Sequence, residues 1–163
     1  MHSEEIIIAD RRPLIGLARI GLLELLPLLA KKVLVPRAVW MEVTHARSDA
    51  PGAKEVAVQA WMEVEDVGAG TVEPLLLFVG QGEAEAIAMA QVRPGAVLLL
   101  DDLRARKLAE RLGLRRLGTV ALLGLAKRRG LIAALKPALD ALVGHGIYLR
   151  REWIDAALRE AGE

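Results

Sequence analysis

The stretch Glu5-Ile6-Ile7-Ile8-Ala9-Asp10 decides the fold class, because it is a short β-branched run that stops at a carboxylate. A run of this length and composition is typical of a strand buried inside a sheet. A second apolar run, Val97-Leu98-Leu99-Leu100, stops in the same way at Asp101-Asp102. Helical patterns and two further strand patterns lie between the two runs. We therefore predict an α/β fold, a parallel sheet with helices on both faces.

The remaining segments alternate between strand and helix patterns. Strands are predicted at residues 5–9, 32–35, 62–67, 97–100 and 114–117, and turns or loops at residues 48–52 and 68–70. Helices are predicted at residues 13–20, 22–29, 36–46, about 53–61, 83–91, 102–112, 119–129, 133–143 and 151–161. Thr119 is predicted to cap the helix at residues 119–129, and Asp101 is the preferred cap for the helix at residues 102–112. We expect one domain over residues 1–163, with a helical extension from about 133 to 163.

Composition excludes several classes of protein. The 163 residues are 53% hydrophobic and 26% charged, as in a globular protein, and the net charge of +1 indicates no overall attraction for a polyanion. The absence of cysteine excludes disulfides and zinc–thiolate sites. The apolar region 14–30 carries Arg19, Glu24 and Pro27, which argues against a membrane span, and we expect a cytoplasmic protein. Abundant Arg and Glu without asparagine suit a thermophile or a GC-rich genome.

Four acidic positions lie beside apolar segments: Asp10, Glu42, Glu83 and the pair Asp101-Asp102. Carboxylates brought together at the edge of a core repel one another, so their convergence implies a bound divalent cation. Each position also has a simpler interpretation. Asp10 suits a strand-ending turn, Glu42 a half-exposed helix surface, Glu83 the first turn of a helix, and Asp101-Asp102 a capping pair.

Taken together, the segments around these acids resemble the PIN domain, in order and over nearly the whole chain. The resemblance extends to a branch of PIN-like proteins with a terminal Gly-Thr and Ala-Lys-Arg-Arg-Gly-Leu-Ile segment, present here at 117–119 and 126–132. The matching segments are Ile-Ile-Ile-Ala-Asp with Pro-Leu-Ile-Gly-Leu-Ala, Val-Pro-Arg-Ala-Val-Trp-Met-Glu-Val, Gly-Gln-Gly-Glu-Ala-Glu-Ala-Ile-Ala-Met-Ala and Gly-Ala-Val-Leu-Leu-Leu-Asp-Asp.

The resemblance implies a nuclease fold, a five-stranded parallel sheet between two layers of helices, with acidic residues clustered around Mg²⁺ or Mn²⁺. Matched position by position, the catalytic residues are Asp10, Glu42, Glu83 and Asp102. The implied metal ligands are Asp10, Glu83, Asp101 and Asp102. Glu85 lies about 200° around a helix from Glu83, so the two cannot face one ion, and we favour Glu83.

One departure from the family pattern is Arg11-Arg12, where PIN domains usually carry small hydroxyl residues. A guanidinium cannot bind a cation and partly neutralises neighbouring carboxylates. The two arginines either contact substrate phosphates or make the site too positive for a metal. Arg104 is a further candidate for nucleic-acid binding. Aromatic residues are nearly absent from the basic clusters, so base-specific readout is not expected to dominate.

The function implied by the resemblance is metal-dependent cleavage of single-stranded RNA, leaving a 5′-phosphate and a 3′-hydroxyl. PIN-like proteins often act as the toxin of a toxin–antitoxin pair, which implies a small antitoxin as partner. The alternative is a catalytically inert PIN-fold module that binds RNA or a protein, and a receiver-like phosphoacceptor ranks last. Leu135, Leu139 and Leu142 form one stripe, which packs on the domain or, as the alternative, in a homodimer.

Overall fold

The computed structural model describes residues 5–45 and 50–163, and in these residues the strands form one five-stranded sheet. The strands are β1 (Ile6–Ala9), β2 (Lys32–Pro36), β3 (Met62–Glu65), β4 (Val97–Leu99) and β5 (Arg115–Leu117). The helices before β4 are α1 (Arg11–Arg19), α2 (Leu25–Leu29), α3 (Arg37–Thr44), α4 (Ala53–Ala57), α5 (Ala69–Val72), the 3₁₀ helix η1 (Glu73–Leu77) and α6 (Gln81–Gln91). The later helices are α7 (Leu103–Arg111), α8 (Thr119–Arg128), α9 (Lys136–Gly144) and α10 (Arg151–Ala161).

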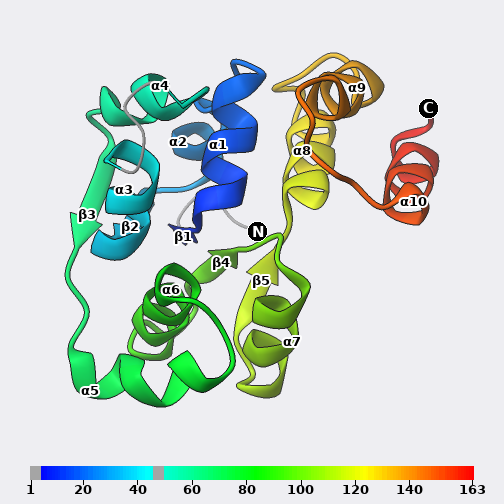
Figure 1. Cartoon of the computed structure of the whole chain (residues 1–163). Helices are drawn as coiled ribbons and strands as arrows, with labels where there is room; N and C mark the ends of the chain where they lie inside the picture. The colour runs from blue at the N-terminus through cyan, green and yellow to red at the C-terminus, as the bar shows by residue number, and fades with distance from the viewer. Residues whose placement is uncertain (1–4, 46–49) are drawn as a thin grey trace.

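All neighbouring strands run parallel, in the order β3-β2-β1-β4-β5. Figure 1 shows α1 to α4 together with α8 and α9 on one face of the sheet, and α5, α6 and α7 on the other. The predicted fold class, a three-layer α/β/α arrangement around a five-stranded parallel sheet, is confirmed.

The two faces of the sheet bury alternate residues of the same strands. Ile7 and Val33 belong to the core under α1, α2, α8 and α9. Ile8, Leu34 and Leu98 belong to the core under α6 and α7. Because a strand that is covered on both sides has no polar face, these strands are continuous apolar runs, as the sequence predicts.

Strand order reverses at β1, whose neighbours are β2 on one edge and β4 on the other. The Asp10 N–H donates to the Leu99 carbonyl at 3.1 Å, so Asp10 still belongs to the ladder with β4. Asp101-Asp102 follows β4 at the same end of the sheet. Crevices at such switch points are where open α/β sheets place their ligand sites.

Several predicted boundaries and caps are wrong. Residues 69–77 are helical, where a loop was predicted at 68–70, and α6 begins at Gln81 rather than at Glu83. The cap of α7 is Asp102 and not Asp101, because the Asp102 carboxylate accepts from the N–H groups of Arg104 and Ala105 at 3.0 Å each. Gly118 occupies the N-cap of α8, and Thr119 is its first residue. Residue 46 of the predicted helix and residues 48–49 of the predicted turn lie outside the described residues.

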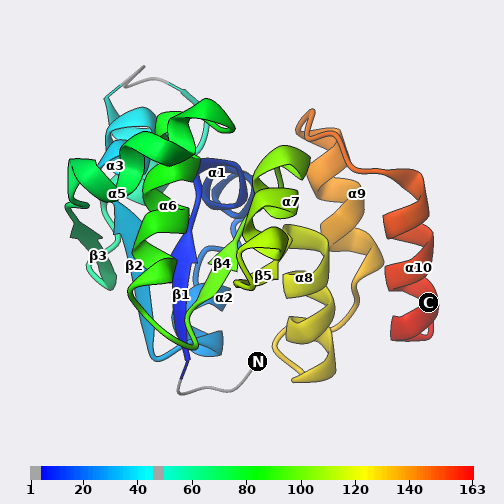
Figure 2. The ribbon, with the colours of Figure 1, turned by 90° about the horizontal axis from the view of Figure 1, so that it is seen from below.

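The C-terminal helices pack beside β5 and α8 at one end of the sheet (Figure 2). Leu135, Leu139 and Leu142 are almost fully buried, which confirms that this stripe packs within the chain. The Glu163 carboxylate accepts from the N–H groups of Leu135 and Lys136 and so caps the start of α9. In the described part of the chain, no helix is long and apolar enough to cross a bilayer.

Candidate active site

Asp10 is a buried carboxylate at the end of the central strand, with 2% of its surface exposed. It occupies the N-cap position of α1 and makes no side-chain cap bond there, although the backbone N–H of Arg11 interacts with the carboxylate. The carboxylate lies at the crevice between the ends of β1 and β4. A buried carboxylate in such a place needs either a proton or a positive partner.

Glu42 and Glu83 reach the same crevice from α3 and α6, which pack closely against each other. The approach depends on Gly82, because a Cβ there would lie 3.0 Å from Glu42 Oε1 and 3.2 Å from Val39 Cγ2. The Gly82 N–H also donates to the Glu42 carboxylate. The glycine in Gly-Gln-Gly-Glu therefore allows α6 to bring its first turn against Glu42.

Burial and neighbouring carboxylates raise the pKa values of Asp10 and Glu42. Burial, followed by the charges of Glu83 and Glu42, raises the pKa of Asp10 to about 7, although the Arg11 N–H and guanidinium act in the opposite direction. Burial also raises the pKa of Glu42, with Glu83 and Glu85 adding to the shift and Arg11 opposing it. Asp10, Glu42 and Glu83 thus form one electrostatic group, and together they favour a positive charge in the crevice.

Glu85 has a different, structural task. Its carboxylate accepts from the backbone N–H of Ala38 at 2.9 Å and from Gln81 Nε2 at 3.0 Å. The first bond satisfies an N–H group at the start of α3, where Pro36 occupies the N-cap and has no hydroxyl or carboxylate to offer. Glu85 therefore holds α3 in place, while the charge of Glu83 acts on Asp10.

Asp101 and Asp102 also divide into different tasks. Asp101 accepts from the Thr119 N–H at 2.8 Å and from the Thr119 hydroxyl at 2.5 Å, which fixes the start of α8. One Asp102 oxygen, Oδ1, caps α7, and Oδ2 lies 3.8 Å from Arg12 Nη2. The metal roles predicted for Asp101 and Asp102 remain predictions, since a carboxylate oxygen has a second lone pair for a further partner.

Arg11 and Arg12 pair with the acidic residues rather than leaving the crevice. Arg11 Nε lies 3.9 Å from Glu42 Oε2, and Arg12 makes the contact to Asp102. Both guanidinium groups are more than half exposed, so each ion pair is weak and easily exchanged for another anion. Arg104 is exposed on α7, and its predicted role in nucleic-acid binding is likewise untested.

The fit of these residues to a metal ion is partial. Carboxylate oxygens such as those of Asp10, Glu42 and Glu83 are the donors that Mg²⁺ and Mn²⁺ prefer. In residues 5–45 and 50–163, however, no three His, Asp or Glu side chains stand close enough to hold an ion as they are arranged. Binding would require Glu42 or Glu83, whose side chains are long, to turn toward Asp10.

The family of the chain follows from comparison with known proteins. The family model of the PIN domain matches residues 6–163. The chain belongs to the PIN-domain family. The match confirms the predicted family. PIN domains are generally nucleases that use divalent metals, so nuclease-type chemistry is the general class of activity for this family. No curated protein matches the sequence.

Membership of the PIN-domain family gives the buried carboxylate a context. Asp10, Glu42 and Glu83 lie in three separate parts of the sequence, and only the fold brings their charges together. The sequence analysis missed four residues that lie near this crevice in the fold: Arg106, Tyr148, Arg150 and Trp153. No sequence signal links these residues, because they come from two segments separated by α8 and α9.

The raised pKa of Asp10 predicts a pH-dependent stability. Since the folded-state pKa is about 7 and the ordinary value is 3.8, protonated Asp10 stabilises the fold at low pH. This stabilisation is lost as the pH rises through 7, and by linkage it amounts to at most about 4 kcal/mol. Asp10→Asn should therefore gain unfolding free energy relative to the wild type between pH 4 and pH 8, measured by urea denaturation in EDTA. A constant difference over this range would contradict the assignment, and Glu73→Gln, at an exposed site, is the control.

The division of tasks between Glu83 and Glu85 predicts opposite phenotypes for neighbouring substitutions. Glu85→Ala removes the acceptor for the Ala38 N–H and should lower the unfolding free energy by about 1 kcal/mol. Glu83→Ala relieves repulsion with Asp10 and should leave stability unchanged or slightly higher. Thermal unfolding of both variants at pH 8 measures the difference, and a greater loss for Glu83→Ala would reverse the assignment.

Proposed function

We propose that this PIN domain is a metal-dependent endoribonuclease that cleaves single-stranded RNA at the crevice between β1 and β4. The observation that carries the proposal is the electrostatic coupling of Asp10 to Glu42 and Glu83, three carboxylates that the chain holds together against their mutual repulsion. The PIN-domain match supports the same class of chemistry.

In this proposal Asp10 and Glu83 are the principal ligands of Mg²⁺ or Mn²⁺, with Asp102 contributing from the end of β4. Such an ion, when bound, supplies polarisation of a phosphodiester and a water of lowered pKa. Glu42, whose carboxylate accepts from the Gly82 N–H and whose pKa is raised by burial, would act as the general base of the crevice. Arg12 would exchange its weak contact with Asp102 for a substrate phosphate.

A second function, an inert module that binds RNA or a protein, is favoured by one specific observation. Arg11 and Arg12 provide the crevice with its own positive charges, at 3.9 Å from Glu42 and 3.8 Å from Asp102. If these contacts replace the cation permanently, the acidic group serves the fold alone. A calorimetric titration with Mn²⁺ at pH 8 discriminates between the two functions, because the inert module binds no ion.

The role of a toxin, restrained by a small antitoxin, is a further part of the proposal and rests on the family alone. Its partner would need to cover the crevice and neutralise Arg11 and Arg12. Acidic side chains or a chain terminus would provide that charge.

The cleavage prediction is tested with labelled single-stranded RNA and Mn²⁺ or Mg²⁺. The wild type should cut internally, while Asp10→Asn and Glu83→Gln should each lose activity by about a hundredfold or more, because both remove a negative ligand from the ion. Gel analysis with end-group mapping reports both the rate and the 5′-phosphate.

The same RNA annealed to its complement is the substrate control, and Glu73→Gln, at an exposed site, is the protein control. Equal cleavage by the wild type and by Asp10→Asn refutes the site, since the activity would then come from elsewhere. Cleavage that persists in EDTA refutes the requirement for a metal.

A further inference from the structure

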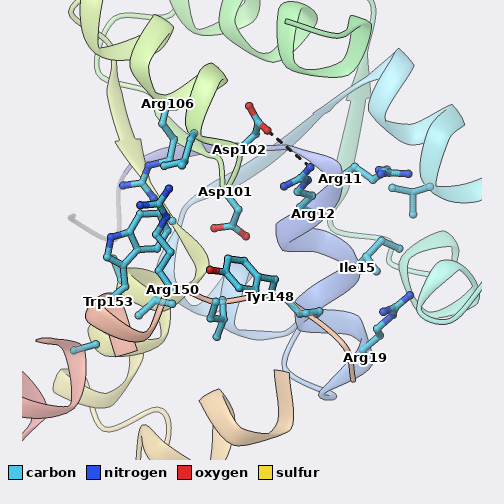
Figure 3. A pocket seen from close by; sticks show the side chains of 18 of the residues that line it. Arg11, Arg12, Ile15, Arg19, Asp101, Asp102, Arg106, Tyr148, Arg150 and Trp153 are labelled. Atoms are coloured by element: carbon cyan, nitrogen blue, oxygen red, sulfur yellow. Dashed lines mark ion pairs between the residues drawn. The ribbon is translucent and has the colours of Figure 1, made fainter. Parts of the chain in front are cut away.

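A cavity of about 740 Å³ extends from the acidic crevice to the C-terminal segment of the chain. Glu42, Asp101 and Asp102 line one end of it, and α1 forms one side. The opposite side is formed by residues 147–150 and α10, as Figure 3 shows. This volume is in the range of sites for small ligands or for part of a larger chain.

The C-terminal side of the cavity is firmly attached to the domain. Ile147 and Leu149 pack into the core, and Ile147 Cδ1 approaches Gly16 so closely that a Cβ there would lie 3.3 Å away. Arg19 of α1 donates to the His145 carbonyl at 3.1 Å. The segment is therefore a built wall of the cavity, and it is held against α1.

Tyr148 is the aromatic residue of this wall. It lies between Ile147 and Leu149, and all three residues line the cavity. Its surface is 87% exposed, although it lines the cavity. A tyrosine ring held this way offers an open aromatic face on which a flat group can stack.

Trp153 organises two arginines on the same side. The guanidinium carbon of Arg106, from α7, lies 5.3 Å from the Trp153 ring centroid, and that of Arg150 lies 5.5 Å from it. A guanidinium that stacks on a ring keeps its N–H edge free for an anion. Within residues 5–45 and 50–163, no carboxylate forms an ion pair with Arg150. Trp153 is therefore an aromatic neighbour of Arg106, in basic clusters that are otherwise nearly without aromatic residues.

We propose that this wall binds the substrate strand, with an unpaired base stacked on Tyr148 and the flanking phosphates bound by Arg150 and Arg106. The inference rests on the proposed function in taking a nucleic acid as the ligand. It adds the place where the strand lies before it reaches the acids. Five arginines line the cavity, which complements a polyanion: Arg11, Arg12 and Arg19 on α1, and Arg106 and Arg150 beside Trp153.

Stacking on Tyr148 also favours single-stranded over double-stranded nucleic acid. A base can lie on Tyr148 only when it is not paired and stacked within a duplex. The cavity continues to Asp101 and Asp102, so a strand anchored on the wall passes the acidic crevice. The wall therefore gives preference for single strands without requiring a particular base, since every base has a flat face.

The test measures binding separately from cleavage. Fluorescence anisotropy with labelled single-stranded RNA is recorded in EDTA, which withholds the cation that the proposed cleavage needs. Tyr148→Ala should weaken binding by about fivefold or more, whereas Tyr148→Phe should stay within about twofold of the wild type. Arg150→Ala should weaken binding and reduce the slope of log K against log salt by about 0.7.

Arg151→Ala is the matched control for Arg150→Ala, because it removes the same charge one residue away. Its side chain is 92% exposed and does not line the cavity. Thermal unfolding of every variant checks that the fold is retained. Equal losses for Arg150→Ala and Arg151→Ala, or equal affinity of Tyr148→Ala and the wild type, overturn the proposal and assign the cavity to a protein or small-molecule ligand.

The outcomes separate this inference from the proposed function. RNA that binds through Tyr148 and Arg150 but is never cut with Mn²⁺ supports the wall and refutes the nuclease. Cleavage of RNA at the wild-type rate by Tyr148→Ala and Arg150→Ala refutes RNA binding at the wall and leaves the proposed nuclease function intact.

Discussion

The central position of β1 is the constraint on which the rest of the structure depends. The strand is paired on both edges and covered by helices on both faces. The residue that directly follows it is therefore buried as well. Here that residue is Asp10. Placing a carboxylate there raises its pKa and makes the crevice a place for a proton or a cation. Each further acid acts on this first one.

Acidic residues that are close in the sequence make different contacts in the fold. Glu85 holds the start of α3, while the charge of Glu83, two residues before it, acts on Asp10. Asp101 holds the start of α8, while Asp102 caps α7 and keeps one oxygen toward Arg12. In each pair the fold uses one carboxylate to position the helix from which another part of the crevice is built. A site assembled from helix ends is fixed by the hydrogen bonds of those ends.

The sequence is sufficient to predict β1 and β4, because an apolar run that ends at an acid carries both the strand and the site. It is not sufficient for α5 and η1, where Gly68, Gly70 and Pro74 suggest a loop although Val72 and Leu75 pack into a core. The role of Thr119 depends on Asp101, which lies eighteen residues earlier, so local capping rules give the wrong answer. The Trp153 contacts with Arg106 and Arg150 depend on where α10 packs, which no local pattern contains.

The strand order has a consequence for synthesis on the ribosome. The chain emerges with β1 first, but the second neighbour of β1 is made only after α6 has been completed. Until then one edge of β1 lacks its partner, and Asp10 has no ladder bond to Leu99. A nascent polypeptide is therefore without a finished crevice until β4 has been made, and any chemistry of this site has to wait for that strand.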